Sequence, residues 1–202
     1  GGVNIADAAY VKGIRKLCDE QGIVLIVDEV QTGMGRCGTL FAYQHYGIEP
    51  DIMTLAKGIG AGYPLAAVLA KEKFCCFAAG DHGGTYGGNS LGMAVGIAVV
   101  EEIIGRDLSS CAVQMGDYIK GKLSAEASRF NLTNLRGRGL LLAFDVPKEA
   151  GKAIVNKALA KGLLVNSPQP ASIRLMPPLI VEKGHVDEMI TILRGTLEEV
   201  LA

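Results

Sequence analysis

The sequence predicts an α/β layered protein followed by a smaller α+β unit, and three observations carry this prediction. Short apolar runs at residues 23–27, 52–55 and 65–70 have the length and composition of buried strands. Amphipathic or apolar helical patterns precede and follow these runs, which is typical of layered α/β domains. The 27 glycines among 202 residues show no fixed repeat, so they indicate tight turns and close backbone approaches.

Two helices are expected to flank these strands. Asp7 can cap the first helix, and Gly22 ends it. Asn89 or Ser90 can cap the second helix, which runs through Ile104 and is apolar almost all round, so we expect it to be buried. The apolar face of the first helix has helical spacing and consists of Tyr10, Ile14, Leu17 and Cys18.

A second unit is expected to begin near Arg106, which divides the chain into a larger domain, 1–105, and a small C-terminal domain, 106–202. Apolar spacing predicts a long first helix that reaches Phe130 and another helix at 149–161. Strands are expected at residues 140–146, 163–165 and 173–175. The last helix carries apolar side chains at helical spacing: Val186, Met189, Ile190, Leu193, Leu197, Val200 and Leu201.

Composition argues against several classes of protein. Hydrophobic residues make up 49% and the net charge is -1, which gives no reason to expect nucleic acid as a partner. The longest apolar run, 93–100, is too short to span a bilayer, so no membrane partner is expected. The 5 cysteines include no C-x-x-C pair, so we expect no metal site and no disulfide framework. Reduced thiols fit a cytoplasmic protein.

The strongest chemical signal is a polar residue just after each of two predicted strands. Asp28 follows the run at 23–27, and Lys57 follows the run at 52–55. Ligands of open α/β sheets bind at the carboxyl ends of the strands. A structural ion pair would also explain these two residues. The glycines after Lys57 (KGIGAG) favour a site, because they leave room for a flat ligand beside an amine that can attack carbonyls.

Three further signals are weaker. Residues 33–38 (GMGRCG) match a dinucleotide-binding pattern, but residues 29–32 intervene between Asp28 and the first glycine, which that fold needs directly after the strand. The loop 82–90 (HGGTYGGNS) leads into a helix, so its backbone N–H groups and the Thr85 hydroxyl suit a phosphate, although a plain loop with a cap is equally compatible. Arg174 lies in an apolar strand and needs a carboxylate, from the protein or from a substrate.

Five segments resemble the class III pyridoxal-phosphate aminotransferases of fold type I, most closely their acetylornithine branch. They follow the family's order and are LIVDEVQTGMGRCGTLFAY, PDIMTLAKGIGAGYPLAAVLA, HGGTYGGNSLGMAV, LRGRGLLLAFDV and VNSPQPASIRLMPPL. The resemblance implies that 1–105 is the C-terminal portion of the family's large cofactor-binding domain, with part of its sheet, and that 106–202 is its small α+β domain.

The resemblance also implies roles for single residues. Lys57 would hold pyridoxal 5'-phosphate covalently and then shuttle a proton at the substrate α-carbon. Asp28 would pair with the pyridine nitrogen. The ring would also be met by Val30 and Gln31. Thr85 would reach the cofactor phosphate in the neighbouring subunit of a homodimer. Arg174 would bind the substrate carboxylate.

The implied reaction transfers an amino group from N2-acetylornithine to 2-oxoglutarate, in arginine biosynthesis. Relatives that use ornithine, succinylornithine, acetyl-lysine or 4-aminobutyrate remain alternatives. So do a nicotinamide-dependent oxidoreductase that uses the loop 33–38 and a non-catalytic fragment. Family members are about twice as long, so we expect residues 1–202 alone to be inactive without the missing N-terminal half.

Overall fold

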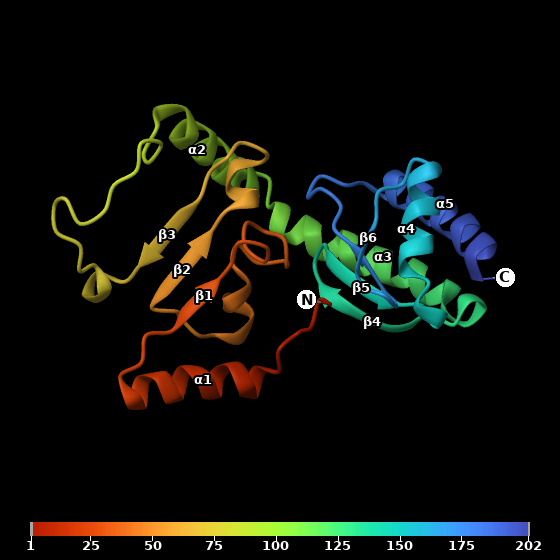
Figure 1. Ribbon diagram of the computed structural model, residues 1–202, viewed down its shortest axis with the longest axis horizontal. Helices are drawn as coiled ribbons and strands as arrows, with labels where there is room; N and C mark the ends of the chain where they lie inside the picture. Colours follow the sequence, from red (N-terminus) through yellow and green to blue (C-terminus); the bar gives the residue numbers. More distant parts are fainter. Residues whose placement is uncertain (1, 202) are drawn as a thin grey trace. The chain divides into compact units, whose positions relative to one another are not determined.

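Two sheets, one of three strands and one of four, organise residues 2–201 of the computed structural model (Figure 1). The chain divides into two compact units. The N-terminal unit is Ala6–Ser109, and the C-terminal unit combines the first residues, up to Ile5, with the chain from Ser110 onward. The predicted split into functional domains at 105/106 stays a prediction. Across residues 2–201, no helix is long and apolar enough to cross a membrane.

The sheet of the N-terminal unit has the order β1-β2-β3, with β1 at Ile26–Asp28, β2 at Ile52–Leu55 and β3 at Ala67–Ala70. β1 and β2 are parallel, and Asp28 is in register with Thr54. β3 runs antiparallel to β2. The central strand is therefore β2, and Met53 and Leu55 are its buried side chains.

Helix α1 (Ala8–Gln21) begins and ends where the sequence predicts. The Asp7 carboxylate accepts hydrogen bonds from the N–H groups of Ala9 (2.7 Å) and Tyr10 (3.4 Å). Gly22 adopts φ 64°, and its N–H donates to the carbonyl of Cys18. These local contacts explain why the limits of this helix were predictable.

The predicted burial in this unit is wrong for much of its apolar surface. Ile23 and Val24 precede β1 instead of belonging to it, and they are exposed together with Ile26. On α1 only Cys18 is buried, while Tyr10 is 63% exposed. The reason is that side chains of a strand point to the two faces of the sheet, and among the described residues little packs against β1 on these faces.

Helix α2 (Ser90–Gly105) forms as predicted, but it is not buried all round. The Asn89 side chain caps it by accepting from the N–H of Gly92 at 2.7 Å. One face contacts the segment after β2, because Gly92 and Gly96 let the helix approach Tyr63 and Leu65. Much of the remaining surface is exposed and includes Leu91, Met93, Ile97 and Ile104.

The C-terminal unit has a core of its own. Its antiparallel sheet has the order β4-β5-β7-β6, and its helices are α3 (Leu108–Phe130), α4 (Gly151–Ala160) and α5 (Lys183–Leu201). Fully or nearly fully buried side chains of all three helices pack on the sheet around Phe144. They include Ile119, Leu123, Ile154, Val186, Leu193 and Leu197. The predicted long helix and last helix are confirmed.

The strands of this unit differ from the prediction at two points. β5 (Leu141–Asp145) and β7 (Ser172–Leu175) are confirmed, whereas β4 (Thr133–Arg138) was not expected because its sequence, TNLRGR, lacks apolar alternation. The strand predicted at 163–165 is absent, and β6 lies at Asn166–Gln169. The physical reason is that the N–H of Leu163 donates to the carbonyl of Ala158 (2.9 Å), so these residues finish helix α4.

Candidate functional site

Asp28 and Lys57 lie at the same edge of the three-stranded sheet. Asp28 is the last residue of β1, and Lys57 follows the parallel strand β2 by two residues. The register pairs Asp28 with Thr54, so the polypeptide needs only three more residues to reach Lys57. Both side chains are exposed. The parallel pair therefore brings an acid and an amine to the carboxyl edge, as the sequence predicted for that edge.

Among the described residues, the Lys57 amine has no partner. Within residues 2–201 it makes no hydrogen bond and no ion pair, whereas Lys71, the next lysine along the chain, contacts Glu49 at 3.3 Å. A structural ion pair of Asp28 with Lys57 is therefore absent from the described residues. Lys57 also has φ 47°, a left-handed conformation that is uncommon for a residue with a side chain. Such strain clusters at functional sites.

The carboxylate of Asp28 is oriented from one side only. Its Oδ1 accepts a hydrogen bond from the N–H of Val30 at 2.9 Å, and no described residue bonds its Oδ2. Val30 and Gln31 follow in a turn and are half-buried. Asp28 thus presents one oxygen toward solvent from a fixed position beside these two residues.

The turn after β1 depends on a residue that the sequence did not single out. Glu29 is 1% exposed and is buried beneath the turn. The only signal was its place between Asp28 and Val30, and a second acid beside Asp28 reads equally well as a solvated charge. Its bonds to Thr32 and Tyr43 could not be inferred from spacing.

Thr85 lies in a long exposed loop between β3 and α2 (Figure 1, yellow-green). The N–H of Gly87 donates to the carbonyl of Gly84 at 3.0 Å, which closes a turn around Thr85. Apart from the glycine itself and its chain neighbours, no described residue has an atom within 4 Å of a Cβ built on Gly83 or Gly84. The loop can therefore be approached closely, and its hydroxyl and N–H groups are available to a ligand.

Arg174 belongs to the C-terminal unit, on β7 opposite Ala143 of β5. It is half-buried, and its Nε is buried without a hydrogen-bond partner among residues 2–201. The chain continues from Arg174 along an apolar groove of about 520 Å³, whose lining includes Leu175, Met176 and Pro177. A buried, unsatisfied guanidinium nitrogen is costly unless an acceptor arrives.

The loop 33–38 does not have the geometry of a dinucleotide site. It forms successive turns in which the N–H of Gly35 donates to the carbonyl of Leu40 (3.2 Å). A single 3-10 turn, Ala42–Tyr46, follows in place of the α-helix whose N-terminus would receive a pyrophosphate. The oxidoreductase alternative loses its structural basis.

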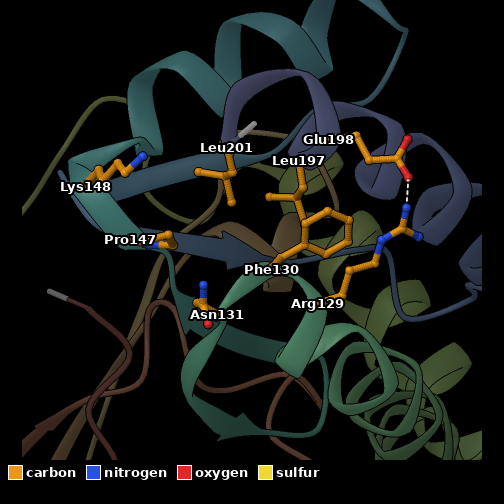
Figure 2. A pocket seen from close by; sticks show the side chains of 8 residues that line it. All are labelled: Arg129, Phe130, Asn131, Pro147, Lys148, Leu197, Glu198 and Leu201. Atoms are coloured by element: carbon orange, nitrogen blue, oxygen red, sulfur yellow. Dashed lines mark hydrogen bonds and ion pairs between the residues drawn. The ribbon is translucent and has the colours of Figure 1, made fainter.

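A second hollow lies in the C-terminal unit, away from all predicted site residues (Figure 2). It has a volume of about 260 Å³, and Phe130 and Leu197 form part of its wall. Figure 2 shows that Arg129 reaches Glu198, with 2.5 Å between Nη2 and Oε1. Of the two cationic side chains that line this hollow, Arg129 and Lys148, the first is thus paired with a carboxylate of the protein itself.

Comparison with known proteins gives a consistent result. A sequence profile described as aminotransferase class-III matches residues 1–197. The chain is 45% identical to an acetylornithine aminotransferase of Caldanaerobacter subterraneus and 46% identical to acetylornithine aminotransferase 2 of Bordetella pertussis. These matches cover 99% and 98% of this chain but 51% of each relative. The chain spans about half the length of the curated relatives it matches.

Solved structures agree with the sequence comparison. The chain is similar to an ornithine aminotransferase from Plasmodium yoelii, with a TM-score of 0.91 and 31% identity over 98% of this chain and 55% of that one. An acetylornithine aminotransferase from Elizabethkingia anophelis has a TM-score of 0.89 and 30% identity over 96% of this chain and 53% of that one.

Proposed function

Because the chain belongs to the aminotransferase class-III family, we propose that it supplies the lysine-bearing part of a transaminase. The family has the fold type I architecture and depends on pyridoxal 5'-phosphate. When bound, this cofactor supplies an electron sink for the carbon from which a proton is removed. The observation that carries the proposal is the unpaired amine of Lys57 at the strand edge that also presents Asp28.

The donor set at this edge fits the cofactor. An aldehyde needs an accessible, unpaired amine, and Lys57 is exposed beside Gly58. A protonated pyridine nitrogen needs a carboxylate oxygen, and Oδ2 of Asp28 has no partner among the described residues. A phosphate also needs hydroxyl and N–H donors, which the Thr85 loop of the neighbouring subunit would offer.

Each residue then has one task. Asp28 keeps a proton on the ring nitrogen, because a carboxylate at hydrogen-bond distance raises the pKa of that nitrogen. Lys57 would hold the cofactor covalently, and its Nζ would move the proton at the amine-bearing carbon. Val30 and Gln31, in the turn after Asp28, would help to hold the ring. Arg174 binds a substrate carboxylate, which would satisfy its buried Nε.

We propose N2-acetylornithine as amino donor and 2-oxoglutarate as acceptor, in arginine biosynthesis. The names of the relatives at 41–46% identity support this choice. Ornithine is the second candidate donor, because one of the similar solved structures is an ornithine aminotransferase. A cytoplasmic location fits the five cysteines, which form no disulfide among the described residues.

We further propose that activity requires the N-terminal half of the relatives, which this chain does not span. We also propose that it requires a homodimer in which Thr85 reaches the neighbouring site. The exposed position of Thr85 supports sharing between subunits. Mixing a Lys57→Ala chain with a Thr85→Ala chain tests it, since one site of a mixed dimer then carries both defects and the other carries none. Activity above both parents supports sharing, and no recovery after confirmed subunit exchange contradicts it.

Reduction with borohydride tests the function as a whole. The chain is incubated with pyridoxal phosphate, alone and with a separately expressed N-terminal half, then reduced and digested. We expect a pyridoxyl group on Lys57 and transamination only when both halves are present. Lys57→Ala should abolish both signals, and Lys73→Ala, an exposed lysine outside the site, is the matched control. Labelling elsewhere, or transamination by the alanine variant, would overturn the assignment.

A further inference from the structure

Glu29 is a buried carboxylate to which the proposed reaction assigns no task. It is 1% exposed, although it lies directly between Asp28 and Val30. Glutamate is rarely buried to this degree, because its charge loses its hydration and must recover it from protein donors. The position of Glu29 therefore needs a reason.

Four hydrogen bonds fix this residue. Its Oε1 accepts from the backbone N–H of Tyr43 at 2.8 Å, and its Oε2 accepts from the hydroxyl of Thr32. Its own N–H donates to the carbonyl of Thr54 on β2 at 3.0 Å, and its carbonyl accepts from the N–H of Gly33 at 2.9 Å. Glu29 thereby joins the turn after β1 to β2 and to the 3-10 turn at Ala42–Tyr46.

The same turn supports the backbone next to Lys57. A Cβ on Gly33 would lie 2.9 Å from the carbonyl oxygen of Glu29, so the turn closes tightly over it. Met34, the next residue, is 4% exposed, and its Cβ would be 3.0 Å from a Cβ on Gly58. The backbone that follows Lys57 therefore packs against Met34, directly beside the left-handed conformation of Lys57.

We infer that Glu29 is a positioning residue, which fixes the turn that orients Asp28 and supports the strained backbone of Lys57. The inference rests on the proposed function of those two residues. Glu29 acts through geometry and not through its charge. A glutamine can replace it, because its amide oxygen can accept from Tyr43 while its NH2 group donates to the Thr32 hydroxyl.

The first test measures structure in the chain without cofactor. Glu29→Ala should accelerate amide hydrogen exchange at residues 30–33 and 57–60 by at least tenfold, and Glu29→Gln should leave both segments near the parent rate. Asp51→Ala is the matched control, because Asp51 is 4% exposed and lies at the opposite edge of the same sheet. Asp51→Ala should lower the free energy of unfolding without accelerating exchange selectively at residues 30–33 and 57–60. Unchanged exchange at 57–60 in Glu29→Ala overturns the inference, whatever the protein catalyses.

The second test measures catalysis in the two-half enzyme. Glu29→Ala should lower kcat about 100-fold with little change in KM, because displacements of about 1 Å cost that much. Glu29→Gln should stay within about threefold, and Asp51→Ala should keep the parent kcat. If Glu29→Ala does not fold, Thr32→Val takes its place in the test. This variant removes one of the two side-chain hydrogen bonds of Glu29 and should lower kcat about fivefold. A glutamine variant as slow as the alanine variant would refute a positioning role, whereas an inactive parent would refute only the proposed function.

Discussion

Alanine substitutions at two glycines of helix α3 should change stability in opposite directions. A Cβ on Gly116 would lie 2.1 Å from the carbonyl oxygen of Gly139 and 2.7 Å from its carbonyl carbon. Both atoms are backbone, in the turn between β4 and β5. On the same helix, a Cβ on Gly121 meets nothing within 4 Å. The two positions therefore differ in packing and share a helical backbone.

The change in the free energy of unfolding follows from two opposing effects, helix propensity and overpacking. Alanine in place of glycine inside a helix stabilises by about 1 kcal/mol, and this gain applies to both positions. Overpacking a close contact costs about 1–3 kcal/mol, and at Gly116 the cost should lie at the upper end, because only backbone can yield. Gly121→Ala should thus raise the free energy of unfolding by about 1 kcal/mol, and Gly116→Ala should lower it by about 2 kcal/mol.

Urea denaturation measures both effects, with amide exchange in β5 as the probe of the C-terminal unit. With a urea dependence of about 2 kcal/mol per M, the midpoint should fall by about 1 M for Gly116→Ala and rise by about 0.5 M for Gly121→Ala. A Gly116→Ala chain at least as stable as the parent would refute the contact between α3 and the β4–β5 turn.

Three further predictions concern charged groups. Asp28→Asn should slow proton removal in the assembled enzyme about 10- to 1000-fold, measured by single-turnover kinetics, because an amide cannot hold the ring nitrogen protonated; an unchanged rate would make Asp28 structural. Arg174→Lys should weaken binding of both substrates, measured as KM, since a point charge cannot replace a bidentate pair; a change confined to cofactor affinity would place Arg174 elsewhere. Hydrogen bonds from Lys157 and Lys161 lower the pKa of Glu199 from 4.5 to about 2. Its ionised form therefore stabilises the fold above pH 4.5, and this contribution is lost as the pH falls toward 2. Glu199→Gln should remove that pH dependence from urea midpoints, and an unaltered profile would contradict the pairing.

Local features of the fold were predictable because their causes are local. Asp7 and Gly22 limit α1 through bonds to residues at most four positions away, and Asn89 does the same for α2. The positions of Asp28 and Lys57 at one edge of the sheet were predictable because each residue comes after a short apolar run. β4 was missed because its pairing with β5, and not its own composition, makes it a strand.

Burial was the least predictable property, because it depends on what lies beyond the element itself. The exposed face of α2 has the composition of a buried helix, and the edge strand β1 has that of a central parallel strand. At the candidate site, Glu29 was overlooked for the opposite reason. Its polarity suggested solvent, while its partners at Thr32 and Tyr43 come from turns that no periodicity reveals.

The uneven distribution of the core has a consequence for how this chain melts. The C-terminal unit encloses a continuous cluster around Phe144, whereas the N-terminal unit buries few large side chains and exposes Ile26, Leu91 and Ile97. Two parts with such different ratios of buried to exposed apolar area should not unfold in one cooperative step. Scanning calorimetry of the isolated chain should give a calorimetric enthalpy larger than the van't Hoff enthalpy, with the N-terminal unit responsible for the lower-temperature transition.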